Sequence, residues 1–142
     1  MPMSVAMPVD RAARRRLVLA AAVAALATLS PVPTRAQSAN RIFPTTALRG
    51  DIQFGEAPEI LVNGRPARLA PGARIRDTGN LVVTPAPLLG RRAVVNYTLD
   101  DLGNVRDVWL LTAEEATRRW PRTPAEAERL VYDPASQSWS RP

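Results

Sequence analysis

The stretch that decides the fold is AVVNYTLDDLGNVRDVWLL, residues 93–111. Its two ends, Ala93–Leu99 and Val105–Leu111, are rich in β-branched and aromatic residues, which favour strands. The middle carries Asp, Gly and Asn, which favour tight turns. The pattern therefore predicts two antiparallel strands joined by a hairpin loop.

Two pairings of these strands remain open. A three-residue loop with Gly103 in the left-handed conformation places Leu99 opposite Val105. A shift of the pairing by one residue places Tyr97 opposite Val108 instead. Each pairing buries an apolar face, so the sequence does not choose between them.

Before this hairpin, short apolar runs alternate with turn residues, and no window carries apolar residues at helical spacing. The clearest unit is Glu59–Val62, Asn63-Gly64 and Arg65–Leu69, because Asn-Gly suits a two-residue type I′ turn. Pro66 has no amide to donate, which predicts an edge strand or an irregular second arm. Three further strands and one turn are expected, at Asp51–Phe54, Ala73–Arg76 and Leu81–Thr84, with the turn at Pro71-Gly72.

After Leu111 the pattern becomes helical. Thr112-Ala113-Glu114-Glu115 is a capping box, which predicts a helix that runs to about Trp120 and stops at Pro121. Thr123-Pro124-Ala125-Glu126 repeats the device and predicts a second helix that ends near residue 131. Residues 132–142 are polar and are expected to form a loose tail or a last edge strand.

Residues 1–36 have the order of a secretory signal peptide. An arginine cluster precedes the apolar run Leu17–Leu29, and Thr34-Arg35-Ala36 predicts cleavage near Ala36. The run is short for a helix that spans a membrane, although an uncleaved anchor and a twin-arginine signal are alternatives. We expect the periplasm, or secretion, with no stable membrane span after cleavage.

Together these elements predict a mainly β fold that follows the signal peptide. We expect a small curved sheet or an OB-like or SH3-like barrel of five to six short strands, with one or two short C-terminal helices. The expected organisation is a flexible tether over residues 37–44, a β-barrel-like domain with a capping helix over 45–120, and a short helix with the loose tail over 121–142. Trp109 is expected in the core and Trp120 half exposed.

The composition limits the chemistry. The chain has 142 residues, a formal net charge of +6, no Cys and no His, and its sequence contains no Lys either. It therefore has no disulfide, no Cys or His metal site and none of the Cys, His and Lys side chains that usually serve as nucleophiles and proton carriers. We assign no catalytic, metal or cofactor site. Because five arginines lie before residue 37, the expected mature chain is only weakly basic.

The densest group of oxygen ligands is Asp100, Asp101, Asn104 and Asp107. Turn chemistry accounts for most of it, and the spacing matches no EF-hand calcium loop. A carboxylate-based hydrolase would need two carboxyls facing each other across a cleft, and nothing in the sequence predicts such a pair.

An arginine-rich stretch is the most suggestive feature of the mature chain. It holds one acid, Asp77, and six arginines: Arg65, Arg68, Arg74, Arg76, Arg91 and Arg92. Arginine binds phosphate and carboxylate in a bidentate manner, so these residues could bind an anionic envelope component such as a lipid phosphate, a wall polymer or nucleic acid. No aromatic residue lies among them to stack on bases, which disfavours nucleic acid. A solvated surface is the alternative interpretation.

Several segments of the chain are familiar in combination: Leu48-Arg49-Gly50, Leu61-Val62-Asn63-Gly64, Leu69-Ala70-Pro71-Gly72-Ala73-Arg74-Ile75-Arg76, Val95-Asn96-Tyr97 and Gly103-Asn104-Val105-Arg106-Asp107-Val108-Trp109. Through them the chain resembles small exported proteobacterial proteins of unassigned function, over about residues 41–115. The resemblance implies export and a compact β unit, and it implies no activity, cofactor or catalytic residue.

The sequence therefore predicts an exported, non-enzymatic binding or interaction module of the bacterial envelope. Its expected partner is an envelope protein or an anionic envelope component. An anion-binding module that uses the six arginines is the first alternative, and a carboxylate-based hydrolase is the second.

Overall fold

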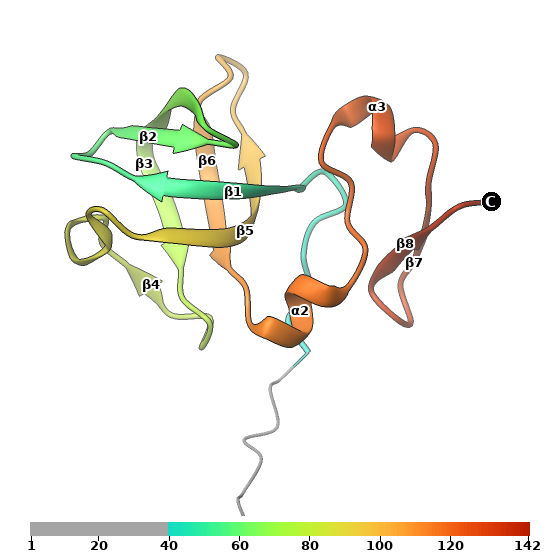
Figure 1. Ribbon diagram of the computed structural model, residues 1–142. Helices are drawn as coiled ribbons and strands as arrows, with labels where there is room; N and C mark the ends of the chain where they lie inside the picture. The colour runs from blue at the N-terminus through green and yellow to red at the C-terminus, as the bar shows by residue number, and fades with distance from the viewer. Residues whose placement is uncertain (1–39) are drawn as a thin grey trace, which may run out of the picture. The chain divides into compact units, whose positions relative to one another are not determined.

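Five strands of the chain close into a barrel, and a sixth strand extends it (Figure 1). The computed structural model describes residues 40–142, and the predicted signal peptide, residues 1–36, lies outside them. The strands are β1 (Leu48–Phe54), β2 (Glu59–Val62), β3 (Arg65–Arg76), β4 (Val82–Val83), β5 (Arg92–Leu99) and β6 (Val105–Leu110). Their order is β2-β1-β5-β6-β3-β4, and β2 also pairs with β3, which closes the ring. The mainly β fold with a small barrel is confirmed, and this closed five-strand order corresponds to the OB-like alternative.

The β2–β3 hairpin forms as its turn residues predict. Asn63 and Gly64 both have positive φ, 51° and 79°, which a type I′ turn requires. Pro66 pairs with Leu61 of β2, and the pairing of β3 with β6 begins only at Leu69. The missing amide of Pro66 therefore lies where β3 has a partner on one side only.

The predicted turn at Pro71-Gly72 is wrong. β3 is continuous from Arg65 to Arg76, and its pairing with β6 shifts register between Leu69 and Arg74. Gly72 has a φ of 74°, the left-handed conformation that such an irregularity uses. Pro and Gly here bend one strand from its partner β2 toward its partner β6, so the two short strands expected are one long strand.

Both pairings considered for the β5–β6 hairpin occur in the same ladder. Next to the turn, Leu99 pairs with Val105, and farther along, Tyr97 pairs with Val108. The register shifts between these pairs, and Arg106 is the extra residue on β6. The bulge satisfies the turn geometry and the burial of the apolar face together.

The interior of the barrel forms the first hydrophobic core. Its largest fully buried apolar side chains come from four strands and are Ile52, Phe54, Ile75, Val95, Val105 and Val108. The short 3-10 helix η1 (Ala86–Leu88) lies in the connection between β4 and β5, and Leu88 packs into this core. The connection between β3 and β5 thereby closes one end of the barrel.

A second core lies on the outside of the barrel, against the C-terminal part of the chain. That part contains α2 (Ala113–Thr117), α3 (Pro124–Ala127) and a hairpin of β7 (Val131–Asp133) and β8 (Ser138–Ser140). Neighbouring rings of this aromatic cluster have centroids 5.3 to 6.1 Å apart, and its members are Phe43, Trp109, Trp120, Tyr132 and Trp139. Because Trp109 belongs to β6, the barrel supplies one of these rings and its burial is confirmed.

Three expectations about the C-terminal region need correction. The second helix ends at Ala127 and not near residue 131. Of the two alternatives for residues 132–142, the loose tail is wrong and a strand is present, since β7 pairs with β8 and Trp139 is 8% exposed. Trp120 is 4% exposed rather than half exposed, and its indole Nε1 donates a hydrogen bond to the carbonyl of Ala47 at 2.8 Å. The two Trp bury each other, which no local pattern in the sequence predicts.

The flexible tether expected over residues 37–44 is also wrong in its described part. Arg41 and Phe43 are both buried, and we call residues 40–47 the N-terminal arm. Arg41 forms an ion pair with Glu115 of α2, and Phe43 packs into the aromatic cluster. The polar composition of this segment does not reveal that Arg41 and Phe43 anchor it, because their partners lie far away in the sequence.

Helix α2 begins as predicted and ends early. The capping box is present: the Thr112 hydroxyl accepts from the amide of Glu115, whose carboxylate accepts from the amide of Thr112. The helix ends at Thr117, because the backbone becomes extended at Arg118. The Arg49 side chain donates to the carbonyls of Ala116 at 3.0 Å and Arg118 at 3.1 Å. Within residues 40–142, no helix combines the length and the apolar character that crossing a membrane requires.

Candidate functional site

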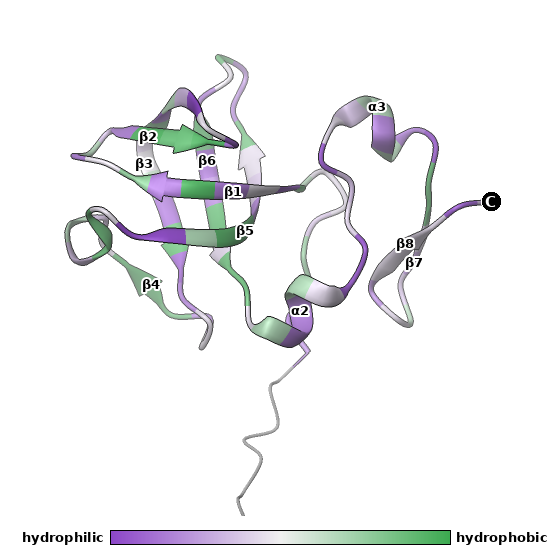
Figure 2. Cartoon of the chain, viewed as in Figure 1, coloured by the Kyte–Doolittle hydropathy of each residue, from purple (hydrophilic) through white to green (hydrophobic). Residues whose placement is uncertain are grey.

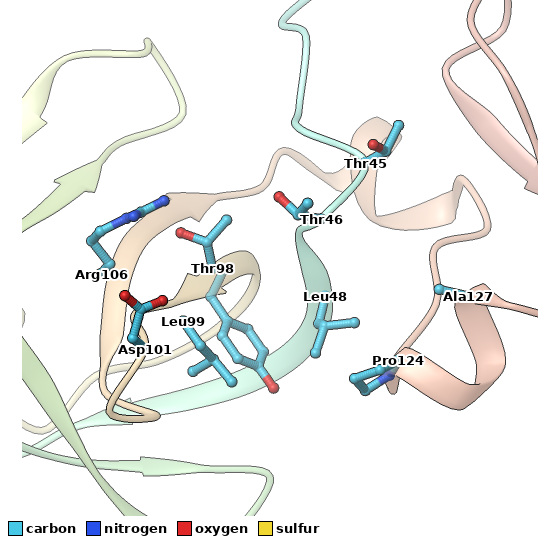
Figure 3. A pocket seen from close by; sticks show the side chains of 10 residues that line it. Thr45, Thr46, Leu48, Thr98, Leu99, Asp101, Arg106, Pro124 and Ala127 are labelled. Atoms are coloured by element: carbon cyan, nitrogen blue, oxygen red, sulfur yellow. The ribbon is translucent and has the colours of Figure 1, made fainter.

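An open groove of about 560 Å³ lies between the barrel and α3, and we call it the barrel groove (Figure 3). The N-terminal arm and the beginning of β1 form one side, and the end of β5, the β5–β6 turn and the beginning of β6 form another. Helix α3 completes the wall. The lining side chains are Thr45, Thr46, Leu48, Tyr97, Thr98, Leu99, Asp101, Arg106, Pro124 and Ala127.

The apolar part of the groove comes from Leu48, Tyr97 and Leu99. Leu48 and Tyr97 pair across β1 and β5, and both also pack into the barrel core. The Tyr97 ring lies so close to β1 that a Cβ at Gly50 would be 2.9 Å from its Cε1 atom. Burial raises the pKa of Tyr97, so its phenol is neutral at physiological pH. This part of the groove is thus rigid and uncharged.

The polar part of the groove is organised around Asp107 of β6. The Thr98 hydroxyl donates to Oδ2 of Asp107 at 3.1 Å, and Nε of Arg106 donates to the same oxygen at 3.1 Å. Arg74 approaches the other carboxylate oxygen at 3.8 Å. Asp107 therefore holds one hydroxyl and one guanidinium in fixed positions on the groove's polar side.

The acidic cluster predicted from the sequence divides in the structure. Oδ1 of Asp100 accepts from the amides of Leu102 at 2.9 Å and Asn104 at 2.8 Å, which is turn chemistry. Asp107 faces the arginines, and Asp101 lines the groove without an ion-pair partner among residues 40–142. The part of the chain that the structure describes contains no cluster of three acidic, His or Cys side chains able to hold a metal ion.

The six arginines do not line one site. Arg68 pairs with Glu59 at 3.3 Å, and the closest carboxylate to Arg74 is that of Asp107. The other four have no ion-pair partner within the described range: Arg65, Arg76, Arg91 and Arg92. β3, which carries four of the six, is separated from β5 by β6 in the ring.

The cation of the groove is Arg106, which no pattern in the sequence singles out. It is the extra residue of the β6 bulge, so its position depends on a register that the sequence left open. Thr45 and Thr46 were also missed, because the N-terminal arm was interpreted as a tether. Asp101 was predicted as part of the acidic cluster in the β5–β6 turn and not as a residue of a groove.

No protein-family model, no curated protein and no solved structure matches this chain. The barrel groove offers hydroxyl donors, one guanidinium, one unpaired carboxylate and a neutral apolar wall. Such a lining can recognise a ligand through hydrogen bonds, ion pairs and apolar contact.

Proposed function

We propose that the chain is a non-catalytic, exported binding module of the bacterial envelope, and that its barrel groove receives an extended segment of a partner protein. The signal-type pattern of residues 1–36 supports export. The lining of the groove supports binding.

The observation that carries the proposal is the combination of an apolar wall with polar groups of both charge signs. Leu99 gives exposed apolar contact area beside the largely buried Leu48 and Tyr97. The hydroxyls of Thr45 and Thr46, with Asp101 and Arg106, surround it. Protein interfaces combine an apolar centre with a polar rim in the same way. The volume of about 560 Å³ also lies in the range of ligand sites in proteins.

The charges of the groove favour a polypeptide over an anionic polymer. Arg106 already donates to Asp107, so its charge is partly neutralised. Asp101 lines the same groove and would repel a phosphate or a uronate. A peptide can instead offer a basic side chain to Asp101 and apolar side chains to the wall.

Site-directed photocrosslinking in intact cells tests the proposal. A photoreactive amino acid at Leu99 reports on the groove, and the same amino acid at Leu102 is the matched control. Both leucines are exposed and belong to the β5–β6 hairpin, but Leu102 lines a different depression, beside Pro58 and Pro71. We expect a protein adduct at position 99 and none at 102.

A peptide that contains the captured segment should then bind the purified chain, and Asp101→Asn should weaken that binding by about tenfold, as expected for the loss of one charge-assisted contact. Equal adducts at positions 99 and 102, or an adduct with a glycan or lipid only, would overturn the proposal.

Anion binding by the arginines is the second candidate function. The observation that favours it is the absence of an ion-pair partner for Arg65, Arg76, Arg91 and Arg92 within the described range. Salt separates the two candidates. Binding through these arginines should weaken steeply between low and moderate salt, whereas peptide binding in the groove should weaken less, because it uses one charge-assisted contact beside apolar contact.

A further inference from the structure

We propose that the closed end of the barrel, residues 76–92, docks on the surface of an anionic lipid bilayer. This surface contains the β3–β4 turn, β4, η1 and the beginning of β5. It shares no residue with the barrel groove, so the inference does not depend on peptide binding there. Of the six arginines considered for anion binding, it uses three, Arg76, Arg91 and Arg92, and the ligand it proposes for them is anionic lipid.

The closed end exposes three large apolar side chains. Leu81 is 68% exposed, Val82 62% and Leu89 61%, and Figure 2 shows hydrophobic colour on β4 and on the loop that follows it. Their exposure follows from the alternation of the chain, because the adjacent residues Val83 and Leu88 pack into the barrel core. Val82 and Leu89 are thereby directed away from the protein.

The backbone of the closed end is held in place before any ligand binds. Oδ1 of Asp77 accepts from the amides of Gly79 and Leu81, both at 2.9 Å. At the other side, the amide of Gly90 donates to the carbonyl of Phe54 at 2.7 Å, and the amide of Phe54 donates to that of Arg91 at 2.9 Å. These hydrogen bonds fix the backbone that carries the exposed side chains, which limits the conformational entropy lost on docking.

Positive charge accompanies the apolar side chains. Arg91 and Arg92 are exposed and Arg76 is half-buried, and none of the three has an ion-pair partner among residues 40–142. Of the acids nearby, Asp77 directs its carboxylate to its own turn, and Glu56 lines a depression beside Leu89. The surface has more arginines than free carboxylates, which complements a negatively charged partner.

A bilayer fits this combination better than another protein does. Apolar side chains that enter the headgroup region and basic residues that meet lipid phosphates are how peripheral proteins bind anionic membranes. The free edge of β4 is only two residues long, so it offers little to a strand added by another chain. The arginines can make bidentate contacts with phosphate oxygens.

The absence of cysteine allows a direct test. A Leu89→Cys variant is labelled with an environment-sensitive fluorophore. A Leu102→Cys variant, labelled in the same way at an exposed position of the β5–β6 turn outside residues 76–92, is the matched control. Each is mixed with vesicles of phosphatidylcholine alone, with vesicles that also contain phosphatidylglycerol, and with glycerol phosphate in solution. We expect a blue shift only for the label at position 89, and only with the phosphatidylglycerol vesicles.

A charge-matched pair of variants then separates the closed end from general attraction. Arg91→Gln with Arg92→Gln should weaken vesicle binding about thirtyfold, since each basic residue near an anionic surface contributes about a factor of five. Arg65→Gln with Arg68→Gln removes the same charge elsewhere and should change binding by less than about threefold.

Equal losses in the two pairs of variants would overturn the proposal, because net charge alone would explain them. A shift of both labels, or of neither, would overturn it too. A shift with glycerol phosphate in solution would show an ion site instead of a bilayer surface.

Discussion

Glu115 fixes the N-terminal arm to the rest of the molecule. Its Oε1 accepts from Nε of Arg41 at 2.9 Å, and Arg41 also donates to the carbonyls of Asp77 and Leu110, both at 2.7 Å. Both charged side chains are buried. One guanidinium thus connects the arm, the β3–β4 turn, the end of β6 and α2.

Removing the carboxylate charge should therefore be costly. Glu115→Gln leaves the Arg41 charge buried without its counterion, so we expect the free energy of unfolding in urea to fall by about 3 kcal/mol. Glu114→Gln is the matched control, because Glu114 forms an exposed ion pair with Arg118, and it should change the same quantity by less than about 0.5 kcal/mol. Similar losses in the two variants would contradict a special role for the buried pair.

The same carboxyl should give stability a dependence on acid. Burial alone raises the pKa of Glu115, but the hydrogen bonds from Arg41 and Thr112, with the charge of Arg41, outweigh it and hold the pKa below the ordinary 4.5. The stability that this shift provides is complete well above the unfolded-state pKa and is lost as the pH falls through the folded-state pKa. Below pH 4.5, the free energy of unfolding in urea should therefore fall more steeply with falling pH in the wild type than in Glu115→Gln. Parallel curves for the two proteins would contradict this.

For single residues, the sequence predicts side-chain contacts between positions a few residues apart, but not contacts between residues distant in sequence. The capping box Thr112–Glu115 was evident because both partners lie three positions apart. The pair of Arg41 with Glu115 spans 74 positions, and each residue alone resembles a solvated surface charge. The same holds for Arg106 in the groove, whose neighbour Asp107 was assigned to a turn-rich acidic cluster.

Among the elements, β3 depends on the left-handed backbone conformation of Gly72. Gly72 has a φ of 74° at the register shift, and a Cβ there would meet no atom within 4 Å. The cost of Gly72→Ala is therefore conformational, and we expect the free energy of unfolding to fall by about 1 kcal/mol. Gly72→Asn should lose less, because Asn tolerates the left-handed region. Equal losses for Ala and Asn in urea unfolding would argue against this explanation.

Strand positions were largely predictable, and strand continuity was not. The turn Asn63-Gly64 has one common use, so the β2–β3 hairpin followed from it. Pro71-Gly72 serves equally well for a turn or for an irregularity within a strand, and only the pairing of β3 with both β2 and β6 distinguishes them. The β5–β6 register could not be chosen for a similar reason, since the bulge at Arg106 uses both alternatives.

In the whole molecule, the barrel and the second core on its outside should unfold together, because Trp109 of β6 belongs to the aromatic cluster. The three Trp of the chain all belong to the aromatic cluster, so Trp fluorescence reports on the outer core, whereas far-UV circular dichroism reports mainly on the barrel. Because Trp109 lies on β6, the two signals should give one coincident urea transition. Fluorescence that changes before circular dichroism would show two independent units.

A single change in the C-terminal hairpin should move both signals. Trp139→Ala removes a large buried ring from the aromatic cluster, and we expect it to lower the free energy of unfolding by about 3 kcal/mol in both measurements. Ser140→Ala, at the exposed neighbouring position of β8, is the control and should leave the transition within about 0.5 kcal/mol of the wild type. A Trp139→Ala effect confined to fluorescence would contradict the coupling of the two cores.

The arrangement of the whole molecule was the least predictable level. The sequence indicated strands followed by short helices, and this suffices for a small barrel. It did not indicate that the outer face of β6 is covered, because the rings that cover it come from segments around residues 43, 120 and 139. The barrel groove was missed for the same reason: its walls are segments distant in sequence.

The meeting of the chain's early and late segments has a consequence for biosynthesis. Asn40 accepts a hydrogen bond from Arg118, and the amide of Trp139 donates to the carbonyl of Arg119. While the ribosome is still adding residues before 139, Trp120 lacks the ring of Trp139 that packs against it. The nascent polypeptide therefore reaches its final packing only after that last tryptophan has emerged from the ribosome.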